Sequence, residues 1–436
     1  MTAEIVVMNS EAIALAADSA VTLQQGPQQK VSTTANKLYE LSRKHPVGIM
    51  VYGNARFMNL PWETIIKTYR DEVLPENGFY TLAEYATSFL NYLSYKNLQF
   101  PDGADLNYIR IFVQTLLFKI REEIDSDIGQ AIDDGKDLDE NMILGIVEAV
   151  INKRYEFYRR EDPLFPYRIG SAVLRKYRRG IDQEIADVLS GLYLSNTAKQ
   201  KLRRTLSHAF SKAFVQDVGS GVVVAGFGQK EFLPMVESYL IEGIILHESN
   251  GVTNEILKQK RDAEGCADGF ELRSAVIPFA QREMVERFME GVDPLYRYAE
   301  EEFLSGLCED FASKVVRDLS RYNDDEKMTI KRDLEQYGRR LIREFSSNMD
   351  ELITLNFTDP TITAVGQLAK SELALMAESL VHLTSLKRKV SQEPETVAEP
   401  IDVAVITKGD GFVWIKRKHY FEANINPQYF IKRIKE

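Results

Sequence analysis

Two apolar stretches at the start of the chain decide the fold: residues 4–8 read EIVVM, and residues 12–17 read AIALAA. The first is rich in β-branched residues and ends at the turn pair Asn9-Ser10, and the second stops at Asp18-Ser19. Short apolar runs bounded by turn residues are typical of buried strands. They predict an antiparallel hairpin in which Asp18 returns to the level of Thr2.

Further strands and a helix follow this hairpin. We expect a polar, Gln-rich loop as far as Ala35, then strands over 37–41 and 47–52, the second ending at Gly53. Pro61 then opens a helix that reaches about Val73. Two hairpins followed by a helix indicate a mixed α/β opening.

The rest of the chain alternates between helical periodicity and strand patterns. We expect five segments: an N-terminal core part over 1–78, a helical insertion over 79–215, central strands over 216–285, a second helical block over 286–360, and a last core helix with C-terminal strands and tail over 361–436. The last helix is expected over 363–389. In the second block, apolar residues at helical spacing predict one buried stripe: Leu304, Cys308, Phe311, Val315 and Leu319.

Composition excludes several classes of protein. Of the 436 residues, 44% are hydrophobic and 27% charged, which is typical of a folded chain and not of a disordered one. The net charge of −11 argues against a dominant nucleic-acid surface, because phosphate binding needs a basic one. Two cysteines and five scattered histidines offer no disulfide framework and no metal-ligand spacing. No sorting signal and no bilayer-length apolar run are found, so we expect a cytoplasmic protein without a membrane partner.

Residue 2 is a threonine, and its position carries chemistry. Removal of Met1 before a small residue would leave Thr2 with a free α-amine. A hydroxyl is a poor nucleophile until a base takes its proton, and an α-amine has an ordinary pKa of about 7.7–8.0, close enough to neutral for that task. A neighbouring lysine keeps such an amine deprotonated, and an aspartate holds the lysine in place.

The first strands supply these partners in order. Asp18 ends the second strand and Lys37 opens the third. Gly53 closes the fourth, where its backbone N–H is placed to face a developing oxyanion. The pattern is therefore that of an N-terminal-nucleophile hydrolase.

These residues resemble the proteasome β-subunit family, in particular its bacterial HslV-type and Anbu-type peptidases. The matching stretches are Thr2, residues 16–22 (AADSAVT), 37–39 (KLY) and 51–55 (VYGNA). Residues 224–228 (VAGFG) look like the central strand and turn of the same family. The similar pieces cover about half of the chain.

The resemblance implies a four-layer αββα sandwich within the α+β class, here with a large helical insertion. It implies that Thr2 is the nucleophile and, through its amine, the base, that Asp18 and Lys37 tune it, and that Gly53 supplies the oxyanion donor. The backbone of Thr22 would hold an extended substrate. A peptide or unfolded-protein substrate, a homo-oligomer and a separate ATPase partner are further implications, and no cofactor or metal is expected.

Two segments depart from the family. Where it has Gly-Ser-Gly between a strand and the next helix, this chain has Pro278-Phe279-Ala280-Gln281, and the turn before the strand at Ile401 reads Ala398-Glu399-Pro400. An inactive proteasome-like scaffold that acts through its helical insertion is therefore an alternative. An amidase for small non-peptide substrates, using the same nucleophile, is a third reading.

Each of these sequence features also has a purely structural interpretation. Asp18-Ser19 also fits a plain turn cap, and Lys37 an exposed edge-strand lysine. The basic runs at 175–179 and 199–204 fit either solvated helix faces or a surface for an acidic partner or a nucleic acid. The glycines around 219–228 flank a strand and lack the Lys-Ser or Lys-Thr of a phosphate loop.

Overall fold

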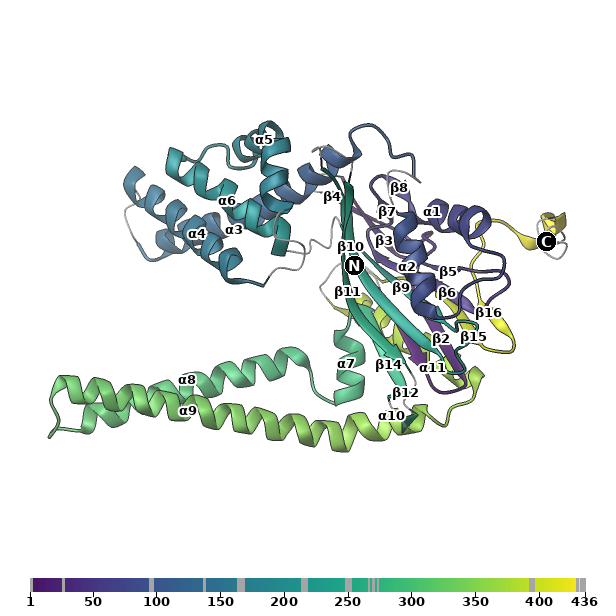
Figure 1. Cartoon of the computed structure of the whole chain (residues 1–436). Coiled ribbons are helices and arrows are strands. Elements are labelled where there is room, and N and C mark those ends of the chain that lie inside the picture. Colours follow the sequence, from purple (N-terminus) through teal and green to yellow (C-terminus); the bar gives the residue numbers. More distant parts are fainter. Residues whose placement is uncertain are drawn as a thin grey trace. The chain divides into compact units, whose positions relative to one another are not determined.

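A computed structural model of the chain describes residues 3–25, 28–93, 98–135, 139–162, 169–212, 219–247, 253–265, 267–268, 271–272, 274–391, 397–428 and 431. The chain divides into two compact units. The first comprises Met1–Thr34, Cys266–Val405 and Val413–Glu436, and the second comprises Ala35–Gly265 and Ile406–Phe412. Both units contain helices and an antiparallel sheet, so the protein belongs to the α+β class (Figure 1).

The sheet of the first unit has five strands in the order β14-β1-β2-β15-β16. Its strands are β1 (Ala3–Met8), β2 (Ala12–Ala17), β14 (Ala275–Ala280), β15 (Asp402–Thr407) and β16 (Gly411–Lys416). Strand β1 lies between β14 and β2 and is antiparallel to both. The N-terminal strand is therefore central in its sheet, while its neighbour β14 comes from far along the chain.

The predicted N-terminal hairpin is confirmed. Every residue of β1 and β2 is buried, and the register pairs Glu4 with Ala17 and Met8 with Ile13. Helix α11 (Lys370–Val390) packs on these two strands, and its Leu373 and Ala377 join their apolar residues in one core. This burial explains why the two strands are almost uninterruptedly apolar and do not alternate.

The remaining helices of the first unit precede α11. They are α7 (Glu283–Glu290), α8 (Pro294–Asp318), α9 (Asp324–Ile353) and α10 (Asp359–Val365), with a π-helical turn over Thr354–Thr358. Helices α8 and α9 form an antiparallel hairpin (Figure 1). Its ends are well specified: Asp293 caps α8, and Asn323 forms a capping box with Glu326 at the start of α9.

The sheet of the second unit has the order β11-β10-β9-β6-β5. Its strands are β5 (Leu38–Glu40), β6 (Val47–Gly53), β9 (Ser220–Gly226), β10 (Met235–His247) and β11 (Thr253–Gly265). Adjacent strands are antiparallel throughout. Two short strands, β7 (Arg56–Phe57) and β8 (Leu60–Pro61), lead into the first helix.

Among the described residues of the second unit there are six α-helices. They are α1 (Trp62–Thr68), which continues as a π-helical turn over Tyr69–Val73, α2 (Leu82–Tyr92), α3 (Ala104–Asp133), α4 (Glu140–Arg160), α5 (Ile169–Val188) and α6 (Asn196–Lys212). The predicted helix from Pro61 to Val73 is thus confirmed. Helix α2 packs on β9 and β10.

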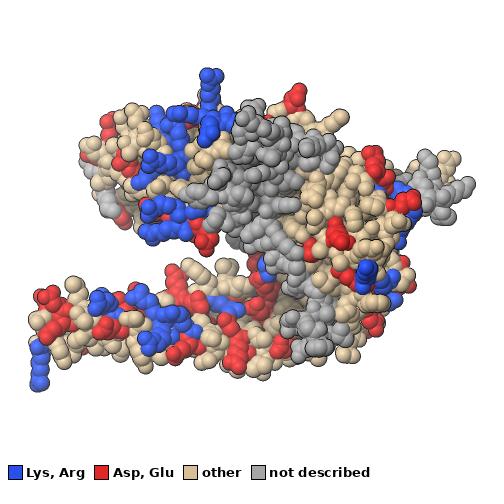
Figure 2. Space-filling view, viewed as in Figure 1, with Lys and Arg blue, Asp and Glu red and all other residues tan. Residues whose placement is uncertain are grey.

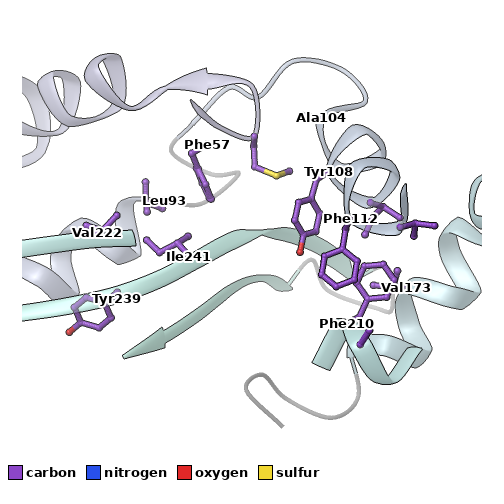
Figure 3. Close-up of a cluster of buried hydrophobic side chains, with 14 of the residues drawn as sticks. Phe57, Leu93, Ala104, Tyr108, Phe112, Val173, Phe210, Val222, Tyr239 and Ile241 are labelled. Carbon is purple, nitrogen blue, oxygen red and sulfur yellow. The ribbon is translucent and has the colours of Figure 1, made fainter. Parts of the chain in front are cut away.

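The helical block and the sheet of this unit share one continuous apolar core (Figure 3). Phe112 of α3 and Phe210 of α6 stack with ring centroids 4.3 Å apart. Tyr108 of α3 lies between this pair and the sheet residue Ile241 (Figure 3). The helices are therefore packed against the sheet of the same unit.

Several sequence predictions are wrong. Residues 21–32, expected as loop, form the hairpin of β3 (Val21–Gln25) and β4 (Gln28–Ser32). Strand β11 was not expected, and the helix expected over 363–389 divides into α10 and α11 around Gly366. Phe311 is exposed, whereas the other four members of its expected stripe are half-buried between α8 and α9. No helix in the described part of the chain is long and apolar enough to cross a membrane.

Candidate functional site

Asp18 is fully buried at the end of β2 and binds three backbone amides. Its Oδ1 accepts a hydrogen bond from Ala3 N at 3.1 Å, and its Oδ2 accepts from Ala20 N at 2.9 Å and Ala398 N at 3.1 Å. The amide of Asp18 in turn donates to Ala3 O at 3.2 Å. Because Ala3 N belongs to the peptide bond that follows Thr2, Asp18 is fixed one residue from the expected nucleophile.

The turn after Asp18 is joined to the segment before β15. Ser19 N donates to Ala398 O at 3.1 Å, and Ser19 Oγ donates to Pro400 O. Ser385 of α11 donates from its hydroxyl to Val397 O at 3.2 Å, which ties the same segment to the helix. The stretch Ala398-Glu399-Pro400, a departure from the family at the sequence level, is therefore a structural partner of Asp18.

The second departure, at residues 278–281, also lies at this end of the sheet. Pro278, Phe279 and Ala280 belong to β14 and do not follow it as expected, and Ala280 pairs directly with Ala3. Ala280 has φ +63°, in the left-handed region that glycine favours. A strained non-glycine residue therefore occupies the position where the resemblance to the proteasome-like family would lead one to expect a glycine-containing segment.

Gln281, which follows β14, is buried and meets a buried cation. Its Oε1 accepts from Arg388 Nε of α11 at 2.9 Å. The carboxylate of Glu283 lies 4.0 Å from Arg388 Nη2. This pair fastens the C-terminal half of α11 to the end of β14.

Lys37 and Gly53 belong to the second unit. Lys37 is 4% exposed, and its carbonyl accepts from Val51 N at 2.9 Å, which aligns the start of β5 with the end of β6. Gly53 ends β6 with φ +82° and is exposed, so its position in the left-handed region requires a glycine. Lys37 and Gly53 are thus positioned by the same pair of strands.

Ser220 holds the turn after Gly53. It pairs with Gly53 across the β6–β9 ladder. Its hydroxyl accepts from Trp62 Nε1 at 2.9 Å and donates to Asn54 O at 2.9 Å, while Asn54 N donates to Gly219 O at 3.1 Å. This relay of buried groups fixes the backbone beside the expected oxyanion donor.

Two expected site residues receive little description. Thr2 lies outside the described residues, and of Thr22 only the backbone is described, in β3 opposite Val31. The structure therefore brings Asp18 to Ala3 in the first unit, and Lys37 near the end of β6 in the second. The chemistry available is a buried carboxylate at the N-terminal strand, a buried lysine, and a backbone N–H at a constrained glycine.

Sequence reasoning missed the supporting residues. The roles of Ala398, Gln281 and Arg388 depend on pairings across more than a hundred positions, and only the two departing segments pointed to them. The sequence assigns no role to Ser220. A buried serine opposite a turn glycine is visible only when the strand register is known.

A second candidate site is a groove of ≈ 460 Å³ between α5 and α6, entirely within the second unit. Its lining residues are Leu174, Arg175, Arg178, Ile181, Asp182, Gln200, Arg203 and Arg204. The two basic runs noted in the sequence therefore converge on one groove. Figure 2 shows Lys and Arg side chains gathered over this helical part of the unit.

Four arginines but only one carboxylate, that of Asp182, are among the residues that line this groove. Asp182 lies 2.6 Å from Arg203 Nε and 3.9 Å from Arg178 Nε. Among the described residues, Arg175 and Arg204 form no ion pair. The groove therefore carries an excess of positive charge above an apolar floor formed by Leu174 and Ile181.

Helix α5 is kinked beside the groove, at Tyr177, where φ is −104° and ψ is 15°. The Tyr177 hydroxyl donates to Asp105 Oδ2 at 2.5 Å, and Lys176 Nζ lies 3.5 Å from the same oxygen. Burial would raise the pKa of Asp105, but the hydrogen bond from Tyr177, together with Leu106 N and Lys176, holds that pKa below its ordinary 3.8. The kink is thus stabilised by a charged acceptor on α3.

No group of three metal-ligating side chains occurs among the residues that the structure describes. A scan of the sequence against protein-family models finds no match, and a search of the curated proteins finds no significant relative.

Proposed function

We propose that the protein is an N-terminal-nucleophile hydrolase of the proteasome-like type that cleaves amide bonds with Thr2 after removal of Met1. The observation that carries the proposal is the hydrogen bond between Asp18 and the amide that follows Thr2. A fully buried carboxylate at this point costs desolvation energy that a plain turn does not require.

The two sheets are consistent with the architecture that this proposal needs. In the first unit α11 packs on β1 and β2, and in the second α2 packs on β9 and β10. Each unit thus provides one helical layer and one sheet. A four-layer αββα sandwich with inserted helices is the arrangement we propose for them.

The reaction follows from the roles of three groups. The Thr2 hydroxyl attacks the substrate carbonyl carbon while its own α-amine takes the hydroxyl proton. The negative charge on the carbonyl oxygen is stabilised by the N–H of Gly53, and the departing amine receives the proton from the α-ammonium. Water, deprotonated by the same α-amine, then hydrolyses the resulting ester and frees Thr2. Lys37 keeps the α-amine unprotonated at neutral pH.

The first experiment is mass spectrometry of the N-terminal peptide. The proposal requires Thr2 as the first residue, and a chain that retains Met1 on most molecules contradicts it. With Met1 absent, Thr2→Ala is tested against a library of fluorogenic peptides and small amides, with Thr2→Ser as the matched variant that keeps a hydroxyl. Thr2→Ala is expected to abolish turnover and Thr2→Ser to retain part of it.

A second candidate function is that of a binding module, and the groove between α5 and α6 favours it. Four arginines around an apolar floor are suited to an anionic partner, since guanidinium groups bind carboxylate and phosphate oxygens in bidentate fashion. This candidate predicts anion binding that Thr2→Ala leaves unchanged. If Thr2→Ala and the unchanged chain have equal activity in the peptide and amide assay, the scaffold is favoured over the hydrolase.

A further inference from the structure

The hairpin of α8 and α9 exposes many large apolar side chains. The helices have 25 and 30 residues, and their buried residues are Ala312, Gly338 and Ile353. A surface helix normally places one apolar stripe against a core. Here each helix also has a second stripe of large apolar side chains that are exposed.

The second stripe consists of large side chains. The eight that make up this stripe are between 41% and 70% exposed: Tyr296, Phe303, Leu307, Phe311, Tyr337, Leu341, Phe345 and Leu352. Leu295, Tyr298 and Met328 are exposed as well but lie off the stripe at helical spacing. Uncharged surface lies between the charged side chains along this hairpin in Figure 2. Scattered single apolar residues need no explanation, but rows at helical spacing mark an interaction surface.

Both stripes lie on the same side of the hairpin. The two helices touch where Gly338 approaches Cys308, so closely that a Cβ on Gly338 would come within 2.9 Å of the Cys308 Cβ. Each exposed stripe is offset from this contact by one residue in the same direction, since Leu307 precedes Cys308 and Tyr337 precedes Gly338. Antiparallel helices are related by a local two-fold axis, which places such equivalent positions on one face. We call the eight residues the apolar face.

The area of the apolar face matches what a stable interface needs. A large aromatic side chain has about 150–250 Å² of surface, so the five aromatic members, somewhat over half exposed, present on the order of 600 Å² per chain, to which the three leucines add. Specific protein interfaces bury about 800 Å² on each partner. Burying this face accounts for an interface of standard size without any further contact.

The order of residues on α8 is self-complementary about Leu307. Phe303 and Phe311 lie four positions to either side of it, and Glu300 and Lys314 lie seven positions to either side. In two antiparallel copies of α8 related by a two-fold axis at Leu307, Phe303 meets Phe311 and Glu300 meets Lys314. Among the described residues neither Glu300 nor Lys314 forms an ion pair within the chain.

We infer that the apolar face binds a second copy of this chain, with α8 antiparallel to α8 of the partner and Leu307 on the two-fold axis. The two hairpins then form a four-helix bundle across the interface. A symmetric dimer needs a patch that complements itself, and the charge pattern around Leu307 meets that requirement. This inference rests on α8 and α9 alone and does not depend on the hydrolase proposal.

Charge reversal tests the pairing in the full chain by sedimentation equilibrium. Glu300→Lys puts like charges opposite each other at two symmetric positions, and Lys314→Glu does the same, so each is expected to weaken the dimer about tenfold. The double variant Glu300→Lys/Lys314→Glu restores both pairs and is expected to restore the affinity. A non-additive rescue of this kind does not arise from a loss of folding.

A cross-link locates the axis independently. In a background of Cys266→Ser and Cys308→Ala, Leu307→Cys is expected to form a covalent dimer with a short bismaleimide. Ser313→Cys, about 120° around α8 from Leu307, is the matched control and is expected to remain uncross-linked. Circular dichroism and the thermal midpoint confirm that each variant is folded.

Three outcomes overturn the inference. A dimer whose affinity is unchanged by either charge reversal uses another surface. If the folded chain sediments as a monomer throughout the micromolar range, the apolar face does not bind a second copy. Cross-linking of Ser313→Cys as efficient as that of Leu307→Cys would likewise contradict the stated geometry.

Discussion

Asp18 and the backbone of Ala3 are joined by two hydrogen bonds: Ala3 N donates to the carboxylate oxygen Asp18 Oδ1 at 3.1 Å, and the backbone N of Asp18 donates to Ala3 O at 3.2 Å. The second carboxylate oxygen accepts from Ala20 and Ala398. This one side chain therefore joins the N-terminal strand, the turn after β2 and the segment before β15. It serves the structure whether or not Thr2 reacts.

Asp18→Asn separates these two roles. One amide oxygen replaces two acceptors, and the amide NH₂ opposes backbone donors, so we expect a loss of about 2–4 kcal/mol in the free energy of unfolding. Urea denaturation measures it, with the exposed Asp102→Asn as control. A loss below about 0.5 kcal/mol would show that the buried bonds contribute little. Under the proposed function, turnover by the folded variant falls as well.

Ala280→Gly is expected to stabilise the protein by about 0.5–1 kcal/mol. Alanine at φ +63° is strained by about 1–2 kcal/mol, and glycine removes this strain at an entropic cost of about 0.5–1 kcal/mol. Ala275→Gly in the same strand provides the matched control, because Ala275 has no positive φ and should be destabilised. Equal losses in both variants would contradict a strained Ala280.

Ser220→Ala is expected to cost about 1–3 kcal/mol, because Trp62 Nε1 loses its acceptor inside the protein. The turn after Gly53 also loses its hydrogen bond to Asn54 O. Thermal unfolding measures the effect, with the exposed Ser190→Ala as reference. If the hydrolase proposal holds, turnover decreases beyond what the lower stability explains, since the oxyanion donor is less well positioned.

The groove between α5 and α6 is expected to bind tripolyphosphate with an affinity that falls as salt rises. Arg175→Gln/Arg204→Gln removes two guanidinium groups and should weaken binding at least about tenfold, as charged hydrogen bonds contribute about 1.5–3 kcal/mol each. Arg179→Gln, in the same basic run but outside the lining, should change little. Calorimetry provides the measurement, and equal binding by all three chains excludes this groove as the site.

The Asp105–Tyr177 contact gives a pH dependence of known sign. The pKa of Asp105 is lowered in the folded protein, so its contribution to stability is present above the ordinary pKa of 3.8 and is lost as the pH falls through the lower folded value. The stability difference between the unchanged chain and Asp105→Asn should therefore persist at pH 7 and vanish at strongly acidic pH. Urea midpoints across the acidic range test this. A difference that grows on acidification would reverse the sign.

The sequence is sufficient to predict elements whose pattern is local. The strands at 4–8 and 12–17 and the helix after Pro61 were predictable from apolar runs and turn residues, and so was the return of Asp18 to the start of β1. Strands β3 and β4 were not, because their polar, Gln-rich sequence lacks the alternation that marks a half-buried strand. Their formation depends on pairing with each other.

Long-range partners were beyond local reasoning for a different reason. Arg388 meets Gln281, and Ala398 meets Asp18, only once the strand order β14-β1-β2-β15 is known. Phe311 shows the converse error. It fits the periodicity of the predicted stripe in α8, but its side chain is exposed in the structure.

The bond between Asp18 and Ala398 spans 380 positions, and this distance sets an order of events during synthesis. At about 5–20 residues per second, the ribosome delivers Ala398 roughly 20–75 s after Asp18. Strand β14 also arrives late, so β1 waits for one edge partner and Asp18 for its last amide until most of the chain has been made. A nascent or truncated chain therefore has its first residues but not the surroundings that fix them, and any chemistry at Thr2 is withheld until translation is nearly complete.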